Sequence, residues 1–128
     1  MKGRLKLTVP ARSCGVLALR PRLDHPQLIS TSRHITQGIV DVVAERWDAD
    51  AKVLAGRSKV VANDPYELRI ITRGRGAEWL AESAEISAED RRAAVSIGFE
   101  EGNGLLRATI RSAQNREVDW RIAFRVNR

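Results

Sequence analysis

Hydrophobic residues recur at every second position over long stretches of this sequence, and this alternation limits the possible folds more than any other feature. It is clearest near the C-terminus, where the apolar positions are Val118, Trp120, Ile122, Phe124 and Val126. A period of two places alternate side chains on one face of a β-strand, so the pattern predicts a half-buried strand. The ranges Tyr66–Ile70, Val95–Phe99 and Leu106–Ile110 show the same pattern. Four strands with one polar face each favour antiparallel sheets.

Turn-forming residues separate these segments. Asn103-Gly104 predicts a hairpin between the second and third of the internal strands, and Asp48-Ala49-Asp50 predicts another after Trp47. Near the start, Leu5–Val9 and Ser13–Leu19 are expected to be strands on either side of Pro10. A short strand is expected within Gln27–Ser30.

One helical turn is expected. It lies in Ser87–Ala94, where Ser87 can cap the turn and Asp90 follows three residues later. Strands recurring every ~8–12 residues with turns between them are typical of sandwiches and barrels. The predicted fold is therefore all-β: an antiparallel β-sandwich of about eight strands with Greek-key-like connections. With 128 residues, 43% of them hydrophobic, the chain fits a single domain over residues 1–128.

The chain carries a net charge of +6, with Arg far outnumbering Lys. A basic balance raises the question of nucleic-acid binding. The basic residues are scattered along the sequence, and the densest groups are only Arg73/Arg75 and Arg91/Arg92. Nucleic-acid binding is therefore a weak expectation.

The sequence offers no metal or cofactor motif. Cys14 is the single cysteine, so an intramolecular disulfide is impossible, and its strand-like surroundings predict a small buried side chain. His25 and His34 are the two histidines and show no metal-ligand spacing. We expect His34 to be a structural residue. No apolar run approaches the ~20 residues of a membrane-spanning helix.

Several stretches, in order, resemble the C-terminal β-sandwich of α-galactosidase-like (melibiase) glycoside hydrolases. They are Val9–Pro21, Gln27–Gly38, Trp47-Asp48, Leu54–Gly56, Asp64–Ile70 and Val118–Phe124. The resemblance implies a sandwich that packs on a catalytic barrel and supports it. The catalytic aspartates of that family lie on the barrel, which takes ~200 residues or more, so no residue of this chain inherits their role.

The remaining acidic and aromatic residues are mostly expected to have structural roles. The acidic pairs Glu100-Glu101, Glu89-Asp90 and Asp48/Asp50 are expected to be solvated turn or strand-end residues rather than the two carboxyls of a glycosidase. Trp120 and Tyr66 are in phase with core positions, and the Tyr66 hydroxyl is expected near a surface.

Trp79 and Trp47 are the candidates for an exposed platform on which a sugar ring could stack. The favoured function is a non-catalytic accessory module of a glycoside hydrolase, which packs on the catalytic barrel or associates with itself and hydrolyses no glycoside. A carbohydrate-binding module using Trp79 or Trp47 is the alternative, and a basic nucleic-acid-binding domain is a weaker one.

Overall fold

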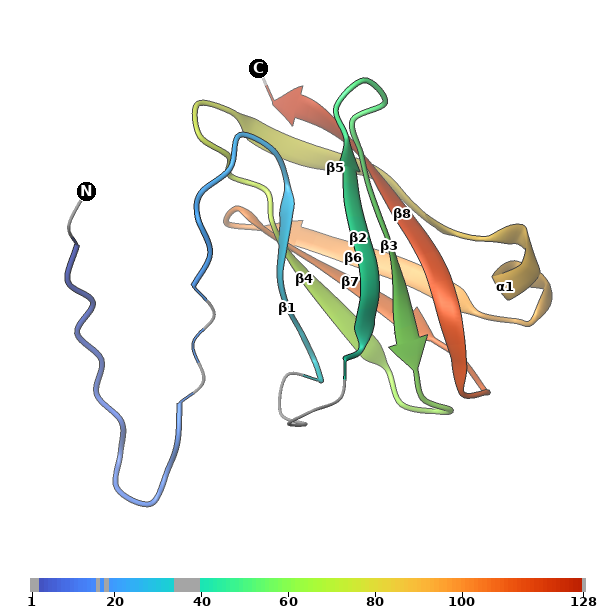
Figure 1. The fold of residues 1–128 in the computed structure, drawn as a ribbon, viewed down its shortest axis with the longest axis horizontal. Coiled ribbons are helices and arrows are strands. Elements are labelled where there is room, and N and C mark those ends of the chain that lie inside the picture. The colour runs from blue at the N-terminus through green and yellow to red at the C-terminus, as the bar shows by residue number, and fades with distance from the viewer. Residues whose placement is uncertain (1–2, 16, 18, 34–39, 128) are drawn as a thin grey trace.

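A computed structural model of the chain describes residues 3–15, 17, 19–33 and 40–127, and its body is a two-layer β-sandwich. One sheet has the strand order β1-β4-β7-β6 and the other has the order β2-β3-β8-β5 (Figure 1). All of these strand pairs are antiparallel. The predicted fold class, an antiparallel sandwich of about eight strands, is confirmed.

The chain passes back and forth between the two sheets. The strands are β1 (Gln27–Thr31), β2 (Val42–Asp48), β3 (Val53–Val60), β4 (Tyr66–Ile71), β5 (Glu78–Ile86), β6 (Ser96–Gly102), β7 (Leu105–Arg111) and β8 (Arg116–Asn127), with the helix α1 (Ala88–Arg92) between β5 and β6. Only β2–β3 and β6–β7 are hairpins among the described strands, and each other step crosses to the opposite sheet. Both hairpins were predicted at these positions.

The turn of the β6–β7 hairpin has the geometry that its sequence predicts. Asn103 and Gly104 both have positive φ angles, 54° and 74°. A two-residue turn of this kind matches the right-handed twist of the strands it joins, which is why Asn-Gly favours hairpins. The helical turn was also predicted correctly, since α1 begins after Ser87, whose side chain accepts a hydrogen bond from the backbone N–H of Asp90.

The core lies between the sheets and is built from the alternating positions of the central strands. The hydrophobic residues with no measurable exposure are Tyr66, Leu68, Ile70, Leu106, Ala108, Ile110, Val118 and Ile122. Trp120 is 2% exposed and belongs to the same cluster, as its strand phase predicts. Each of these residues has its sequence neighbours on the outer face, because successive side chains of a strand point to opposite sides.

At each open side of the sandwich, one glutamate side chain connects the edge strand of one sheet to the edge strand of the other. On one side, Glu45 of β2 accepts a hydrogen bond from the backbone N–H of Leu28 in β1, at 3.3 Å. On the other side, Glu101 of β6 accepts one from the N–H of Ala81, at a bulge in β5, at 3.1 Å. These contacts satisfy backbone donors that edge strands otherwise leave to solvent.

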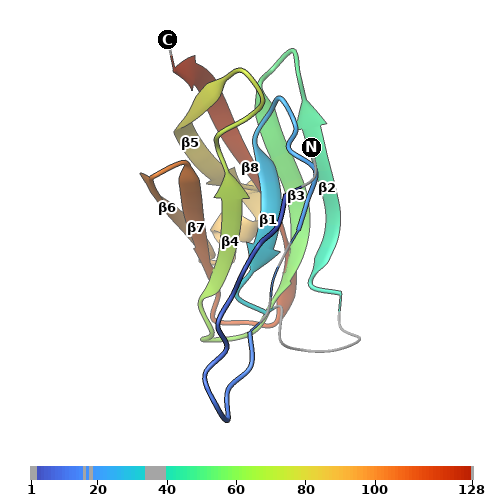
Figure 2. The same ribbon diagram turned by 90° about the vertical axis from the view of Figure 1, so that its left-hand side faces the viewer.

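The N-terminal part of the chain stands away from the sandwich, beside β1 (Figures 1 and 2). We call residues 3–21 the arm. It runs out and back as two extended limbs joined by a turn at Pro10–Ser13, where the Ser13 N–H donates to the Pro10 carbonyl at 3.3 Å. The prediction of strands at Leu5–Val9 and Ser13–Leu19 is wrong for the described residues, because no neighbouring strand pairs with them.

Candidate functional site

The structure brings the two predicted platform residues, Trp47 and Trp79, into one aromatic cluster at the end of the sandwich where the arm leaves it. The Trp47 ring lies edge-on to Trp79, with 5.4 Å between their centroids. It stacks face to face with His25, at 5.1 Å and an interplanar angle of 4°. Phe124 of β8 lies 6.3 Å from Trp47 on the core side.

Trp79 is not an exposed platform. Only 9% of it is accessible, and its indole N–H donates to the backbone carbonyl of Asp24 at 3.1 Å. The residue occupies the second position of β5 and points into the core next to Trp47, so the expectation of an open sugar-stacking face at Trp79 is wrong. Its acidic neighbours in the sequence suggested a wet environment, but they occupy the other positions of the strand.

Trp47 is half-buried and packs against the core, and His25 covers one face of its ring. A stacking platform needs an open ring face. As placed, Trp47 serves as the surface on which the segment before β1 rests.

Further contacts hold the same segment. The Arg22 guanidinium donates to the Gly74 carbonyl at 2.9 Å, and the Arg75 N–H donates to the Leu23 carbonyl at 2.7 Å. Gly74 is required here, because a Cβ at this position would lie 2.8 Å from the backbone of Asp24. Residues 22–25 are therefore the fixed base from which the arm extends. The predicted turn at Arg73–Gly76 provides part of this base, and no helix follows it.

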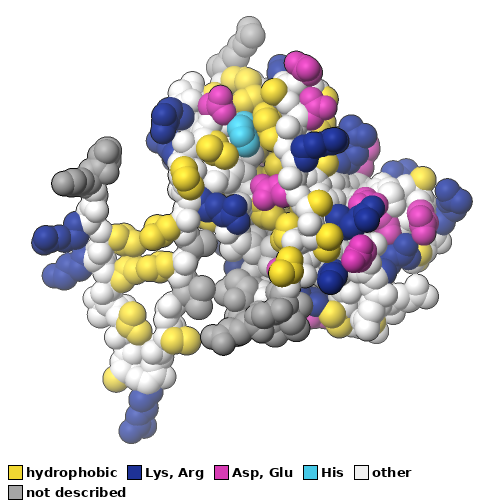
Figure 3. Space-filling view, viewed as in Figure 1, with side chains coloured by type: hydrophobic (Ala, Val, Ile, Leu, Met, Phe, Trp, Pro, Cys, Tyr) yellow, Lys and Arg dark blue, Asp and Glu magenta, His cyan; other side chains and the backbone are white. Residues whose placement is uncertain are grey.

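The arm beyond this base exposes large hydrophobic side chains. They are Leu5, Leu7, Val9, Leu17 and Leu19, each between 53% and 84% exposed. Figure 3 shows hydrophobic side chains between the two limbs and basic side chains on the outer side of the arm. Cys14, predicted to be buried, is exposed. Soluble monomers rarely present clustered apolar surface of this kind.

At the end of β3 that lies away from the aromatic cluster, a series of hydrogen-bonded polar side chains, the buried polar chain, links the two sheets. The Trp120 indole N–H donates to Ser58 Oγ at 2.9 Å, and Ser58 Oγ lies 3.2 Å from the Tyr66 hydroxyl oxygen. The Tyr66 hydroxyl donates to Asp41 Oδ2 at 2.8 Å, and Thr31 donates to the same carboxylate oxygen. The hydroxyl predicted near a surface thus lies inside, since Tyr66 has no measurable exposure.

Within this buried polar network, the pKa values of Asp41 and Tyr66 are both shifted from their ordinary values. Burial alone would raise the pKa of Asp41, but hydrogen bonds from Thr31, Tyr66 and backbone N–H groups outweigh it and lower the pKa below 3.8. Burial, together with the nearby Asp41 carboxylate, raises the pKa of Tyr66 well above 10.0. A neutral phenol donating to an ionised carboxylate is a stable arrangement at neutral pH.

The lowered pKa makes the contribution of Asp41 to stability depend on pH. A carboxyl with a lower pKa in the folded state stabilises the fold above its unfolded pKa and loses that effect as the pH falls through the folded value. We therefore expect the stability difference between wild type and Asp41→Asn, measured by urea unfolding, to shrink as the pH falls from about 7 to about 2. Asp50→Asn, in an exposed turn, is the control and should show no such trend. A difference that stays constant over this range would contradict the role assigned to the Asp41 carboxylate.

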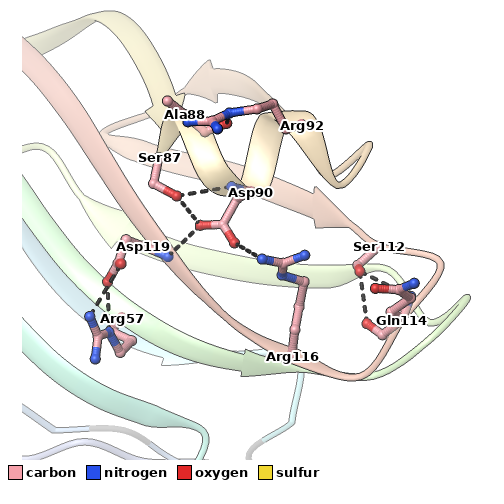
Figure 4. Close-up of polar contacts among 9 residues, drawn as sticks. All are labelled: Arg57, Ser87, Ala88, Asp90, Arg92, Ser112, Gln114, Arg116 and Asp119. Atoms are coloured by element: carbon pink, nitrogen blue, oxygen red, sulfur yellow. Dashed lines mark hydrogen bonds and ion pairs between the residues drawn. The ribbon is translucent and has the colours of Figure 1, made fainter.

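A second polar network surrounds α1 and is shown in Figure 4. Asp90 is 3% exposed; its Oδ1 pairs with Arg116 at 2.8 Å, and its Oδ2 accepts hydrogen bonds from Ser87 Oγ at 2.6 Å and from the Asp119 N–H at 3.1 Å. The expectation that the Glu89-Asp90 pair is solvated is therefore wrong for Asp90. Arg116 on β8 compensates the Asp90 charge, and this ion pair together with the hydrogen bond from the Asp119 N–H joins α1 to β8.

No grouping of three or more metal-ligating side chains occurs among the residues that the structure describes. A groove of about 640 Å³ lies on the outer face of the β2-β3-β8-β5 sheet. Its charged lining is of mixed sign, from Arg46, Arg121, Asp48, Asp119 and Glu85. Trp120 beneath it is 2% exposed, so the groove offers no aromatic platform. His34 lies outside the described residues.

Comparison with known proteins does not identify the chain. No family model, no curated protein and no solved structure matches it. The resemblance to the accessory sandwich of melibiase-like hydrolases therefore depends on the quoted sequence segments alone. In the part of the chain that is described, no helix is long and apolar enough to cross a membrane.

Proposed function

We propose that this chain is a non-catalytic accessory module whose sandwich is a rigid body and whose arm docks it to another folded protein surface. The observation that carries the proposal is the arm itself, with five large apolar side chains exposed beyond a fixed base. Covering such side chains favours association by about 25 cal/mol per Å² of apolar area. Ordered contacts at residues 22–25 keep the arm directed away from its own sandwich.

Two partners fit this description. The sequence resemblance favours the catalytic barrel of a glycoside hydrolase, and the other partner is a second copy of the chain. Interfaces between domains of one protein typically bury ~600–1,500 Å², and closed pairs around a two-fold axis are the commonest self-association.

The alternatives receive less support. A carbohydrate platform made of Trp79 and Trp47 is disfavoured because the first is buried and the second is covered on one face by His25. A nucleic-acid-binding role for the sandwich requires basic charge gathered on its surface, and residues 23–128, which contain the sandwich, carry 16 acidic and 16 basic residues.

The proposal predicts association through the arm. Wild-type chain at tens of micromolar should sediment as more than a monomer under reducing conditions, which exclude a disulfide through the exposed Cys14. Exchanging two arm residues, Leu7→Ser with Leu19→Ser, should weaken the association at least tenfold, because each removes an apolar side chain that contact would cover.

The matched control makes the same change at two exposed valines of the sandwich, Val43→Ser with Val61→Ser, and should associate like wild type. Equal weakening in both double variants would mean general stickiness and would contradict the proposal. So would glycan binding that is abolished by Trp47→Ala and unaffected by the arm variant, which would favour the carbohydrate-binding alternative.

A further inference from the structure

The charge of the chain is divided unevenly between the arm and the sandwich. Residues 1–22 contain six Lys or Arg and no Asp or Glu, whereas residues 23–128 contain 16 of each kind. The whole net charge of +6 therefore belongs to residues 1–22, although the basic residues look scattered when acidic residues are not counted. A surface that receives the arm should be acidic.

The first limb of the arm is also amphipathic as a strand. Leu5, Leu7 and Val9 occupy one set of alternate positions, and Arg4, Lys6 and Thr8 occupy the other. In an extended chain these two sets point to opposite sides. Among the described residues of the arm, the only hydrogen bonds within the arm are those of the Pro10–Ser13 turn. The backbone groups of Leu5–Thr8 are therefore available to pair with another strand.

The edge strand β6 matches this limb in length, polarity and charge. It is an edge because its sheet ends there, and it contains two acidic residues and no basic one. The side chain of Glu100 has no hydrogen-bond or ion-pair partner within the described part of the chain, and Phe99 is 38% exposed. Edge strands with free backbone groups are templates for an added strand.

The alternation of β6 has the phase that the limb requires. Ile97 and Phe99 lie opposite Ile110 and Ala108 of β7, both fully buried, so they face the core side. Glu100 lies opposite the exposed Arg107 and faces outward. The open side of the sandwich at β6 therefore offers Ile97 and Phe99 on its inner face, next to Glu101, which is bound to the Ala81 N–H, and the Glu100 carboxylate on its outer face.

We infer that residues Leu5–Val9 add as an antiparallel strand to the β6 edge of a second copy of this chain. One register satisfies most of the pattern: Lys6 opposite Glu100, Leu7 opposite Phe99 and Val9 opposite Ile97, while Leu5 falls opposite Glu101. Pro10, which cannot donate to a ladder, then falls at Ser96, where β6 begins. This inference rests on the proposed docking function of the arm and names its partner.

The arrangement of the two elements favours exchange between copies. The arm leaves beside β1, and β6 lies at the opposite edge of the same sheet, with β4 and β7 between them (Figure 2). Each copy thus presents a free arm on one side and a free edge on the other. A two-fold axis closes the exchange as a dimer in which each arm pairs with the partner's β6.

A charge exchange tests the pairing directly. Lys6→Glu and Glu100→Lys, each made in the full chain, should raise the dissociation constant of the dimer about tenfold, because like charges opposite each other destabilise paired strands and a reciprocal dimer contains the pair twice. The double variant Lys6→Glu with Glu100→Lys restores opposite charges and should return to within about threefold of wild type. Sedimentation under reducing conditions measures all three.

The control for the double variant is Lys6→Glu with Glu85→Lys. Glu85 is an exposed glutamate on β5, so this control makes the same charge change on the other sheet, away from the proposed pair. It should not restore dimerisation. If Glu85→Lys restored dimerisation as well as Glu100→Lys does, the effect of the charge exchange would be due to net charge alone, and the proposed pairing would be overturned.

The remaining outcomes are also decisive. If the arm served an anionic lipid surface or a nucleic acid, Glu100→Lys would strengthen binding to vesicles of anionic lipid or to RNA, and the charge exchange would restore no dimer. If Leu7→Ser with Leu19→Ser abolishes association but the charge exchange restores nothing, the docking function stands and the β6 register is wrong. If neither has any effect, both are wrong.

Discussion

Trp120→Ala is expected to lower the free energy of unfolding by about 3–5 kcal/mol, the usual cost of removing a large aromatic side chain from a core. Trp120 is 2% exposed, lies in the middle of β8 and donates its indole N–H to Ser58. The substitution therefore leaves a cavity between the sheets and also removes one donor from the buried polar chain. Since small domains have roughly 5–15 kcal/mol in total, this loss is a large share of the stability.

The measurement is urea unfolding followed by fluorescence or circular dichroism. Arg121→Ala, at the next position of β8 and exposed, is the matched control and should stay within about 0.5 kcal/mol of wild type. If the free energy of unfolding of Trp120→Ala lies within about 0.5 kcal/mol of wild type, the packing assigned to β8 is wrong.

Asp90→Ala is expected to cost a similar amount, about 3–5 kcal/mol, for an electrostatic reason. The change removes the carboxylate that faces the largely buried Arg116 guanidinium and leaves that cation uncompensated. It also removes the acceptor for the Ser87 hydroxyl and for the Asp119 N–H. An unpaired buried charge is far more costly than the loss of a surface ion pair.

Glu89→Ala is the control, because Glu89 is the adjacent acidic residue in α1 and is exposed. Unfolding by urea should separate the two variants clearly, with Glu89→Ala close to wild type. Equal losses would mean that Asp90 acts only through general charge near the helix. Asp90→Asn should fall between the two, since the amide oxygen still accepts a hydrogen bond but carries no charge.

The sequence predicts well where alternation and turn chemistry agree. The strands around Tyr66, Ile110 and Trp120, the Asn103-Gly104 hairpin and the Ser87-capped turn of α1 lie where these signals place them. Each depends on short-range patterns, which local geometry alone can satisfy.

Two errors come from the part of the fold that local pattern does not determine. The segments Leu5–Val9 and Ser13–Leu19 alternate or are apolar, but a strand also needs a partner, and the chain supplies none. Conversely, β5 is rich in Glu and Ala, residues of low strand preference, and forms because β8 pairs with it along its length.

The candidate site was predictable only in its residue types. Trp47 and Trp79 were chosen as aromatic candidates, but nothing in the sequence indicates that β2 and β5 meet at the base of the arm. Asp41 carries no motif, and its partners Thr31 and Tyr66 lie on the other sheet. The close approach of Gly74 to Asp24 likewise depends on a contact between segments about 50 residues apart.

Amide hydrogen exchange as a function of protein concentration tests the central claim most directly, because it reports on the backbone of the arm itself. The account predicts that the amides of Leu5–Val9 exchange almost without protection in dilute solution and become protected at tens of micromolar, together with those of β6 (Ser96–Gly102). Arm amides that exchange at the unprotected rate at every concentration, while the chain sediments as a 14.3 kDa monomer, would contradict it.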